Sequence, residues 1–291
     1  MKNKNSRSKK GISPAISTVI ITAITIALVT IAMVFANNFL SARMAESDFN
    51  AAKQFMQTTG LQIDDVAWKI GQTETIRYSS KYATMSVLNA TLSYSYNIYI
   101  KTSGNPSWQL FSSSKTGIIL FNMPNSQYTI SNNWYQLFWP SQTATLTLNG
   151  SSAPTSKVFG VEKIPMSDGN FIRVVTAPMI RMINSNITIG TTNSTFYFRF
   201  YLPLVSLKSA PRISQSVTLT GNAISVKTQN RITSIKINMT FPQTSGFDNT
   251  FFNFPSVQQI INAPLGYPSA SKDCVIELYT GAVGIELGAH A

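Results

Sequence analysis

One long uncharged segment near the N-terminus most constrains what this chain can fold into. Residues 11–42 contain no Asp, Glu, Lys or Arg, and the run over 16–36 reads ISTVIITAITIALVTIAMVFA. A helix rises about 1.5 Å per residue, so this run covers roughly 30 Å, the thickness of the hydrocarbon core of a bilayer. The sequence therefore predicts a helix that is able to span a membrane.

The charges on either side of this segment predict its orientation. The first ten residues carry no acid and five basic residues, Lys2, Lys4, Arg7, Lys9 and Lys10, whereas only Arg43 follows the segment closely. Cytoplasmic flanks of membrane spans carry the excess of Lys and Arg, so we expect the N-terminus inside the cell and the rest of the chain outside. The apolar core of a secretory signal is shorter, about 7–15 residues. A plain membrane anchor stays open as an alternative.

The junction in front of the apolar segment carries a recognisable motif. Residues 7–18 read RSKKGISPAIST: basic residues and a glycine, then Ser-Pro, then an unbroken apolar run. This order resembles the prepilin signal of archaeal type IV pilins, over about residues 7–40. The resemblance implies that a prepilin peptidase in the membrane cleaves between Gly11 and Ile12, next to Lys9 and Lys10, and leaves the apolar helix on the mature protein. Many bacterial type IV pilins have Glu where Ile16 stands, a departure that argues against the bacterial type.

Elementary chemistry is consistent with this layout. Gly11 has no side chain to obstruct a protease at the membrane surface, and Lys9 and Lys10 favour a position among anionic headgroups. Pro14 suits the first helical turn, where its missing N–H would have no partner, and Ser13 is able to cap the helix. We therefore expect the helix to begin just after the cleavage site.

Small residues recur through the apolar segment at spacings that let helices approach one another closely. Three pairs are four residues apart: Thr18 with Thr22, Ala23 with Ala27, and Ala32 with Ala36. A single anchor has no need of such spacings, so they favour packing against other helices. The predicted packing residues are Ala15, Thr18, Thr22, Ala23, Ala27, Ala32 and Ala36.

Helix-forming residues continue beyond the apolar segment to residue 57. An amphipathic stripe is predicted there from Leu40, Met44, Phe49, Ala52, Phe55 and Met56. We therefore expect a cleaved leader over 1–11 and a long helix over 12–59, which spans the membrane before assembly and forms a filament core afterwards. A stalk, or a core helix of the exported domain, is the alternative for the second half.

Period-two patterns dominate the rest of the chain. Apolar and polar residues alternate over 92–101, 196–202 and 235–241, which predicts strands with one buried face each. Asn149-Gly150, Asp168-Gly169 and Gly221-Asn222 read as turns between them. We predict an α+β fold, with an all-β exported domain over 60–291: one immunoglobulin-like sandwich, or two with a boundary near 150–156.

Potential glycosylation sites are frequent. Five Asn-x-Ser/Thr sequons occur, at Asn89, Asn149, Asn186, Asn193 and Asn238. Several would arise by chance in a chain so rich in Asn and Thr. Whether they are glycosylated depends on whether the chain is exported, as we expect for this domain. Asn149 in a turn and Asn238 on the polar side of a strand are the best candidates.

Composition and charge argue against several classes of function. Charged residues make up 12%, about half the usual share. Of the net charge of +12, five charges lie in the leader, which leaves +7 for the other residues. This thinly spread charge is not the basic patch that is typical of nucleic-acid-binding proteins. The single Cys274 excludes an intrachain disulfide, and the single His290 excludes a site with two imidazoles. We predict no metal and no cofactor.

Candidate catalytic groups are few. Asp64 and Asp65 are adjacent and would point apart, and Ser112 with Lys115 matches the S-x-x-K spacing only within a Ser-rich loop. An aromatic run over 134–140, WYQLFWP, could instead form an exposed adhesive patch. We predict no enzyme activity.

The resemblance and the residues together predict a structural subunit of an archaeal type IV pilus-like, adhesive surface filament. Its expected partners are further copies of itself in a helical homopolymer, the prepilin peptidase and the pilus assembly machinery, the membrane before assembly, and host or other cell surfaces. Nucleic acid is not expected. The alternatives are a membrane-anchored extracellular binding module for sugars or peptides and a secreted hydrolase.

Overall fold

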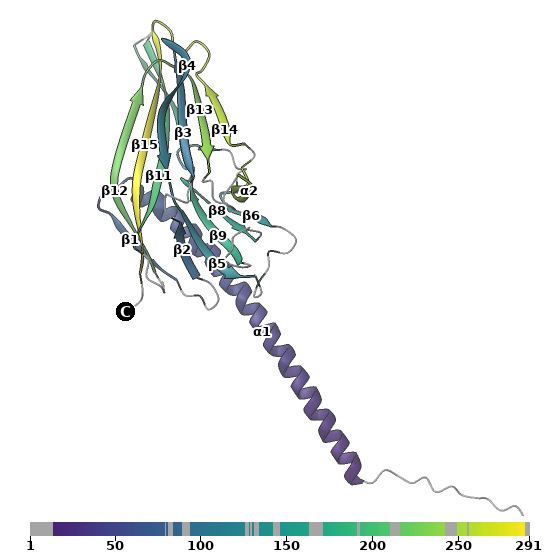
Figure 1. Cartoon of the computed structure of the whole chain (residues 1–291). Helices are drawn as coiled ribbons and strands as arrows, with labels where there is room; N and C mark the ends of the chain where they lie inside the picture. Colours follow the sequence, from purple (N-terminus) through teal and green to yellow (C-terminus); the bar gives the residue numbers. More distant parts are fainter. Residues whose placement is uncertain are drawn as a thin grey trace, which may run out of the picture. The chain divides into compact units, whose positions relative to one another are not determined.

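The chain divides into two units, Met1–Glu46 and Ser47–Ala291, and each is described by itself. The computed structural model describes residues 14–78, 80, 84–88, 94–125, 128, 130, 134–141, 146–162, 171–190, 193–209, 216–241, 249–254 and 256–288. Helix α1 (Pro14–Ala67) belongs to both units, and all strands belong to the second (Figure 1). A long apolar helix followed by a mostly β domain confirms the expected α+β class.

Helix α1 begins at Pro14, as the sequence predicted, because proline at the first helical position has no N–H that would lack a partner. The helix does not stop near residue 59 but continues through Gly60 to Ala67. A Cβ at Gly60 would lie 3.3 Å from Ser156 Oγ and 3.3 Å from the Trp139 ring. Ser156 Oγ also donates to the Gly60 carbonyl at 2.8 Å. Gly60 therefore serves close packing inside the helix and is not a stop.

The last part of α1 is amphipathic and packs in the second unit. Its buried residues are Phe49, Ala52, Phe55, Met56, Thr59, Ile63, Val66 and Ala67. The predicted stripe is correct from Phe49 onward, but Leu40 and Met44 are 57% and 45% exposed. The amphipathic part thus begins later than the sequence indicated.

The strands form three sheets. In order across the first, six-stranded sheet lie β1 (Thr73–Arg77), β12 (Ser216–Gln229), β15 (Lys272–Gly288), β11 (Asn193–Ser209), β10 (Ile180–Ile189) and β7 (Thr147–Asn149). The second, four-stranded sheet has β14 (Gln258–Asn262), β13 (Ile232–Thr240), β3 (Ser95–Thr102) and β4 (Asn105–Lys115). The third, five-stranded sheet has β2 (Thr84–Leu88), β5 (Ile118–Pro124), β9 (Phe171–Pro178), β8 (Ser156–Val161) and β6 (Tyr135–Trp139). A short helix, α2 (Asn249–Phe252), precedes β14.

Two pairings in the six-stranded sheet are parallel. The long strands β11 and β15 run parallel over almost their whole length, and β7 runs parallel to β10. The other ladders are antiparallel. The exported domain is thus mostly β and has several sheets, while an immunoglobulin-like sandwich stays a prediction.

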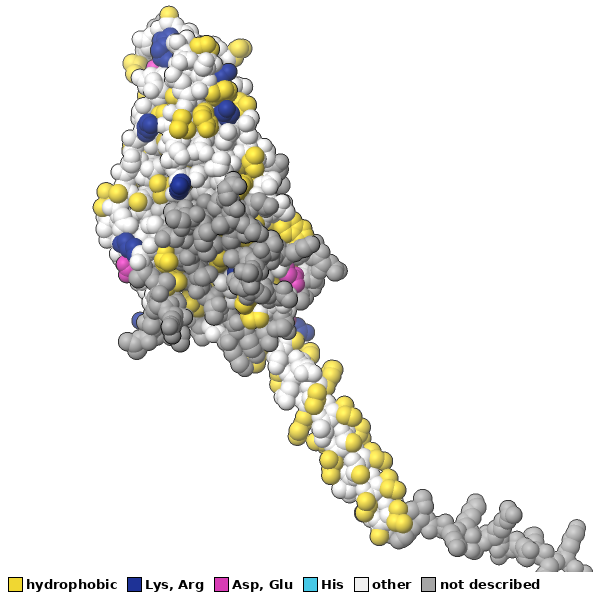
Figure 2. Space-filling view, in the orientation of Figure 1, with side chains coloured by type: hydrophobic (Ala, Val, Ile, Leu, Met, Phe, Trp, Pro, Cys, Tyr) yellow, Lys and Arg dark blue, Asp and Glu magenta, His cyan; other side chains and the backbone are white. Residues whose placement is uncertain are grey.

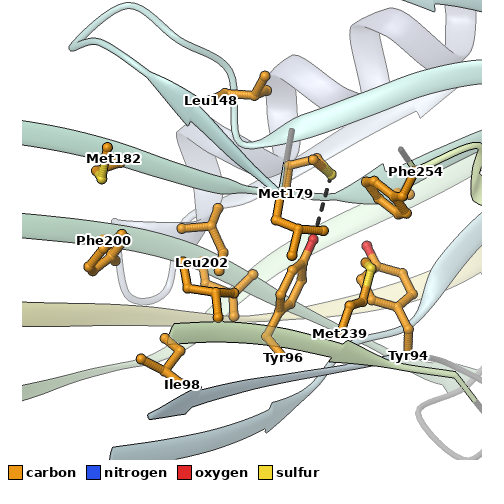
Figure 3. Packing of buried hydrophobic residues seen from close by; sticks show 14 of the residues in the cluster. Tyr94, Tyr96, Ile98, Leu148, Met179, Met182, Phe200, Leu202, Met239 and Phe254 are labelled. Atoms are coloured by element: carbon orange, nitrogen blue, oxygen red, sulfur yellow. Dashed lines mark hydrogen bonds between the residues drawn. The ribbon is translucent and has the colours of Figure 1, made fainter. Parts of the chain in front are cut away.

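The strand faces follow the alternation in the sequence. In β3, Tyr96, Ile98 and Ile100 are buried while the residues between them are partly exposed. Figure 3 shows Tyr96 and Ile98 packed in one cluster with Met179, Met182, Phe200 and Leu202. The Tyr96 hydroxyl reaches the Met179 sulfur at 3.6 Å. The segment 150–156 connects β7 to β8, and both strands lie in the second unit.

The end of α1 lies directly on the backbone of the six-stranded sheet. A Cβ at Gly281 in β15 would lie 2.3 Å from the Ala67 carbonyl oxygen, and one at Gly221 in β12 would lie 2.4 Å from the Lys69 carbonyl oxygen. Both clashes are with backbone, which cannot rotate away. Glycine at these two positions therefore permits the contact between helix and sheet. The predicted turn at Gly221-Asn222 is wrong, because both residues lie inside β12, where the pairing with β15 has a bulge.

We expect Gly281→Ala to lower the free energy of unfolding by about 3 kcal/mol or more, because either the helix end or the strand must shift. Gly104→Ala is the matched control, since no atom lies within 4 Å of its added Cβ. Denaturant unfolding of the full chain in detergent gives both values. Equal stability of the two variants would contradict the close packing described here.

Candidate functional site

The most unusual surface is that of α1 before the β unit. Residues 15–44 are all exposed, and the large apolar side chains among them range from 45% exposure at Met44 to 71% at Phe35. Figure 2 shows hydrophobic side chains along the visible face of this helix. They point in all directions: Ile16, Val19, Ile20, Ile21, Ile24, Ile26, Leu28, Val29, Ile31, Met33, Val34, Phe35, Phe39 and Leu40. A surface of this kind requires lipid or other apolar helices around it.

This segment is long and apolar enough to cross a membrane. An 18-residue window within α1 has a mean hydropathy of 2.7, and none of that window is buried inside the protein. It is the one such helix in the part of the chain that the structure describes. A core helix of a soluble domain would be mostly buried, so the lack of burial favours the membrane or a helical assembly.

The threonines of the segment do not need water. The hydroxyl groups of Thr22, Thr25 and Thr30 donate to the carbonyl oxygens four residues earlier, at 2.9, 2.8 and 2.9 Å. Each hydroxyl is therefore satisfied within its own helix, as an apolar environment requires. These threonines therefore expose mainly their methyl groups to the surroundings of the helix.

The small residues form two stripes along the helix. At 100° per residue, Thr18, Thr22, Thr25, Ala32 and Ala36 fall within about 80° of one another, with Ala15 just outside and Val29 between them. Ala23, Ala27 and Thr30 lie on the opposite side. All the predicted packing residues are therefore on exposed faces of the helix, and they offer two close-approach surfaces.

The predicted processing residues cannot be placed. Lys9, Lys10, Gly11 and Ile12 lie outside the described residues, and Pro14 is the first residue of the helix. At the other end, Arg43 pairs with Glu46 at 2.7 Å and its guanidinium lies 5.2 Å from the centre of the Phe39 ring. The first charges thus follow directly after the apolar segment.

Three of the predicted glycosylation sites are open. Asn149, Asn186 and Asn193 are exposed, although Asn186 Oδ1 accepts from the Tyr267 hydroxyl at 3.3 Å. Asn89 lies outside the described residues. Asn238 is half-buried in β13, a strand paired on both sides, and its Oδ1 is buried without a hydrogen-bond partner. This makes Asn238 a poorer acceptor than the sequence indicated, and Asn149 the better of the two.

The acidic pair Asp64 and Asp65 has structural partners. Asp64 pairs with Arg181 at 2.9 Å and accepts from the Trp68 indole at 2.8 Å, whereas Asp65 faces Lys69 and Gln72. The hydrogen bonds from Lys69 and Gln72 lower the pKa of Asp65. The two carboxylates thus point to different partners, as expected.

The remaining candidates do not converge on a reaction centre. Ser112 and Lys115 lie in strand β4, so the predicted loop around them is wrong. Cys274 is buried, which raises the pKa of its thiol to about 12 and makes it unreactive. Within the described ranges, no three His, Cys, Asp or Glu side chains are grouped so that they could hold a metal ion.

Sequence reasoning missed one buried cation, Lys157 in β8. It is 2% exposed, its ammonium donates to the Phe252 carbonyl at 2.9 Å, and it lies within about 5 Å of three aromatic ring centres. Burial lowers the pKa of Lys157 to about 7. A lysine in a strand normally predicts an exposed position, so only the tertiary structure reveals this one.

Lys157 makes stability depend on pH in a predictable direction. Its pKa is about 7 when folded and 10.5 in an exposed lysine, so the unfolded chain binds more protons between these values. Stability therefore rises with pH in that window. From pH 6 to pH 9 we expect the free energy of unfolding of the native chain to rise by about 2–3 kcal/mol relative to Lys157→Met.

Urea unfolding of the full chain in detergent at the two pH values measures this difference. Lys115→Met, at an exposed position of β4, is the control for loss of a surface lysine. A difference between the native chain and Lys157→Met that does not change with pH would contradict the lowered pKa.

Comparison with known proteins gives no relative: no protein-family model, no curated protein and no solved structure matches this chain. The case for a function therefore rests on the residues and their geometry.

Proposed function

We propose that this protein is a structural subunit of an archaeal type IV pilus-like, adhesive surface filament. The observation that carries the proposal is an exposed helix that is apolar on all sides and follows directly on a prepilin-like signal over residues 7–18. Cleavage between Gly11 and Ile12 would leave this helix at the N-terminus of the mature chain.

The surface of the helix supports a filament core over a plain anchor. A lone anchor needs only apolar side chains, whereas this helix also has small-residue stripes on two opposite sides. The hydroxyl groups of Thr22, Thr25 and Thr30 within them donate to carbonyl oxygens of the same helix. Such a helix is suited to close contact with more than one neighbouring copy.

Membrane and filament are two successive environments of the same segment. Before assembly it spans the cytoplasmic membrane, with the basic N-terminus inside, where prepilin peptidase and the pilus assembly machinery act on it. After assembly the same apolar residues pack against other copies, and the β unit Ser47–Ala291 is presented at the cell surface.

Mechanical shearing tests this proposal. Shearing of intact cells should release filaments that contain peptides of the β unit as a major component, whereas a membrane-anchored binding module would stay with the cell pellet. Exclusive recovery from the pellet, in cells that shed other filaments normally, would contradict the proposal.

A further inference from the structure

The outer face of the four-stranded sheet carries a cluster that neither the fold nor filament assembly requires. Its inner face, with Ile98, Ile100, Ile235 and Ile237, is part of the core. On the outer face, register places Ile260, Lys236, Tyr99 and Leu110 side by side across all four strands. Leu110 is 58% exposed and Ile260 is 51% exposed. The sheet would form equally well with polar side chains at these two positions.

Two lysines are held in this cluster by aromatic rings. The ammonium groups of Lys101 and Lys236 each lie 4.7 Å from the centre of the Trp108 ring, and that of Lys236 lies 4.8 Å from the centre of the Tyr99 ring. Contact with ring faces orders the side chains without neutralising their charge. We call Tyr99, Lys101, Trp108, Leu110, Lys236 and Ile260 the aromatic-lysine face.

The strands of this sheet supply no carboxylate that would compensate these charges. The four strands contain Lys101, Lys115 and Lys236 but no Asp or Glu. No ion pair among the described residues involves any of the three. The face therefore presents ordered positive charge beside apolar surface, which attracts an anion that also has apolar surface.

A polar row borders the cluster on the same face. Ser113 Oγ donates to Asn97 Oδ1 at 2.7 Å, and Asn238, whose Oδ1 is buried, lies opposite Asn97 in the neighbouring strand. Gln258 stands opposite Asn238 on β14. Amide and hydroxyl groups of this kind recognise ligand hydroxyl groups.

We infer that the aromatic-lysine face binds an acidic polysaccharide, one whose sugar rings carry uronate or sulfate groups. A pyranose ring offers C–H surface for Leu110, Ile260 and Tyr99, hydroxyl groups for the polar row, and an anionic group for Lys101 and Lys236. This binding is independent of filament assembly, so it stands or falls separately from the proposed function.

Single-stranded nucleic acid is the other anionic polymer to distinguish. Its bases stack on free aromatic faces along a continuous basic groove. Here the Trp108 ring is already in contact with two ammonium groups, the exposed apolar groups include aliphatic side chains, and the positive charge is confined to a few lysines. Sugar rings pack on aliphatic side chains, so the polysaccharide fits better.

Binding of the full chain in detergent to immobilised alginate, heparin, neutral dextran and a thymidine oligonucleotide tests the inference. We expect alginate or heparin to bind and dextran not to bind. Lys101→Gln with Lys236→Gln should weaken that binding about tenfold or more, which corresponds to about 1.4 kcal/mol for the two lost charge-assisted contacts together. Lys115→Gln, on the same sheet but without a ring contact in the cluster, should change it less than about twofold.

Three results would overturn the inference: dextran binding as well as the acidic polymers, the oligonucleotide binding more tightly than they do, or Lys115→Gln weakening binding as much as the double variant. Trp108→Ala should also weaken binding to the acidic polymers, because it removes the ring that orders both lysines. The Lys→Gln variants keep the test valid even if Trp108→Ala fails to fold.

Discussion

Cells that produce the Gly11→Phe variant are expected to accumulate uncleaved precursor in the membrane and to form no filaments from this chain. Under the proposed processing, the peptide bond after residue 11 enters a protease site at the membrane surface, and a bulky ring in place of glycine would obstruct that approach. The expected loss of processed protein is nearly complete. Immunoblotting of membranes and electron microscopy of the cell surface measure the two effects.

Gly11→Ala is the matched control, because it adds a methyl group and leaves the surrounding charges unchanged. It should be processed far better than Gly11→Phe. Filaments of normal number and a normal mature chain from Gly11→Phe would refute the assignment of the cleavage site.

Thr22→Lys is expected to abolish assembly while the exported β unit still folds. Thr22 lies in the stripe of small residues that runs from Thr18 to Ala36, and its hydroxyl donates to the Thr18 carbonyl oxygen at 2.9 Å. An ammonium group there has no carboxylate to pair with, since residues 11–42 contain no acid. A lysine at the centre of an apolar span costs about 3 kcal/mol per chain, and a packed filament core repeats that cost in every subunit.

Thr22→Val keeps the shape and removes only the internally satisfied hydroxyl, so it should assemble. The readout is the yield of sheared filaments compared with the amount of processed chain in the membrane. Normal fibres from Thr22→Lys would indicate that the helix is an anchor and not a filament core.

Local sequence rules predicted the helix and the strand faces well. The helix starts at Pro14, and the alternation in β3 places Tyr96, Ile98 and Ile100 inside, because both features depend on neighbouring residues alone. The predicted end of the helix at residue 59 was wrong, because Gly60 continues the helix and packs closely against Ser156 and Trp139. Tertiary contacts thus override a local signal at this position.

Features made by distant segments could not be predicted. The parallel pairing of β11 with β15 joins strands far apart in the chain, and no short-range pattern specifies it. Lys157 was missed because its burial depends in part on rings that are distant in the chain, Tyr135 in β6 and Phe254 after α2, besides Phe159 in its own strand. The aromatic-lysine face likewise requires the register of β3 against β13, which brings Tyr99 opposite Lys236.

The most direct test of the filament-subunit account is mass spectrometry of the N-terminal peptide of the chain isolated from the cell surface. The account predicts a mature chain that begins at Ile12 and lacks every residue of the leader over 1–11. A surface chain that still carries Met1 to Gly11 would contradict it.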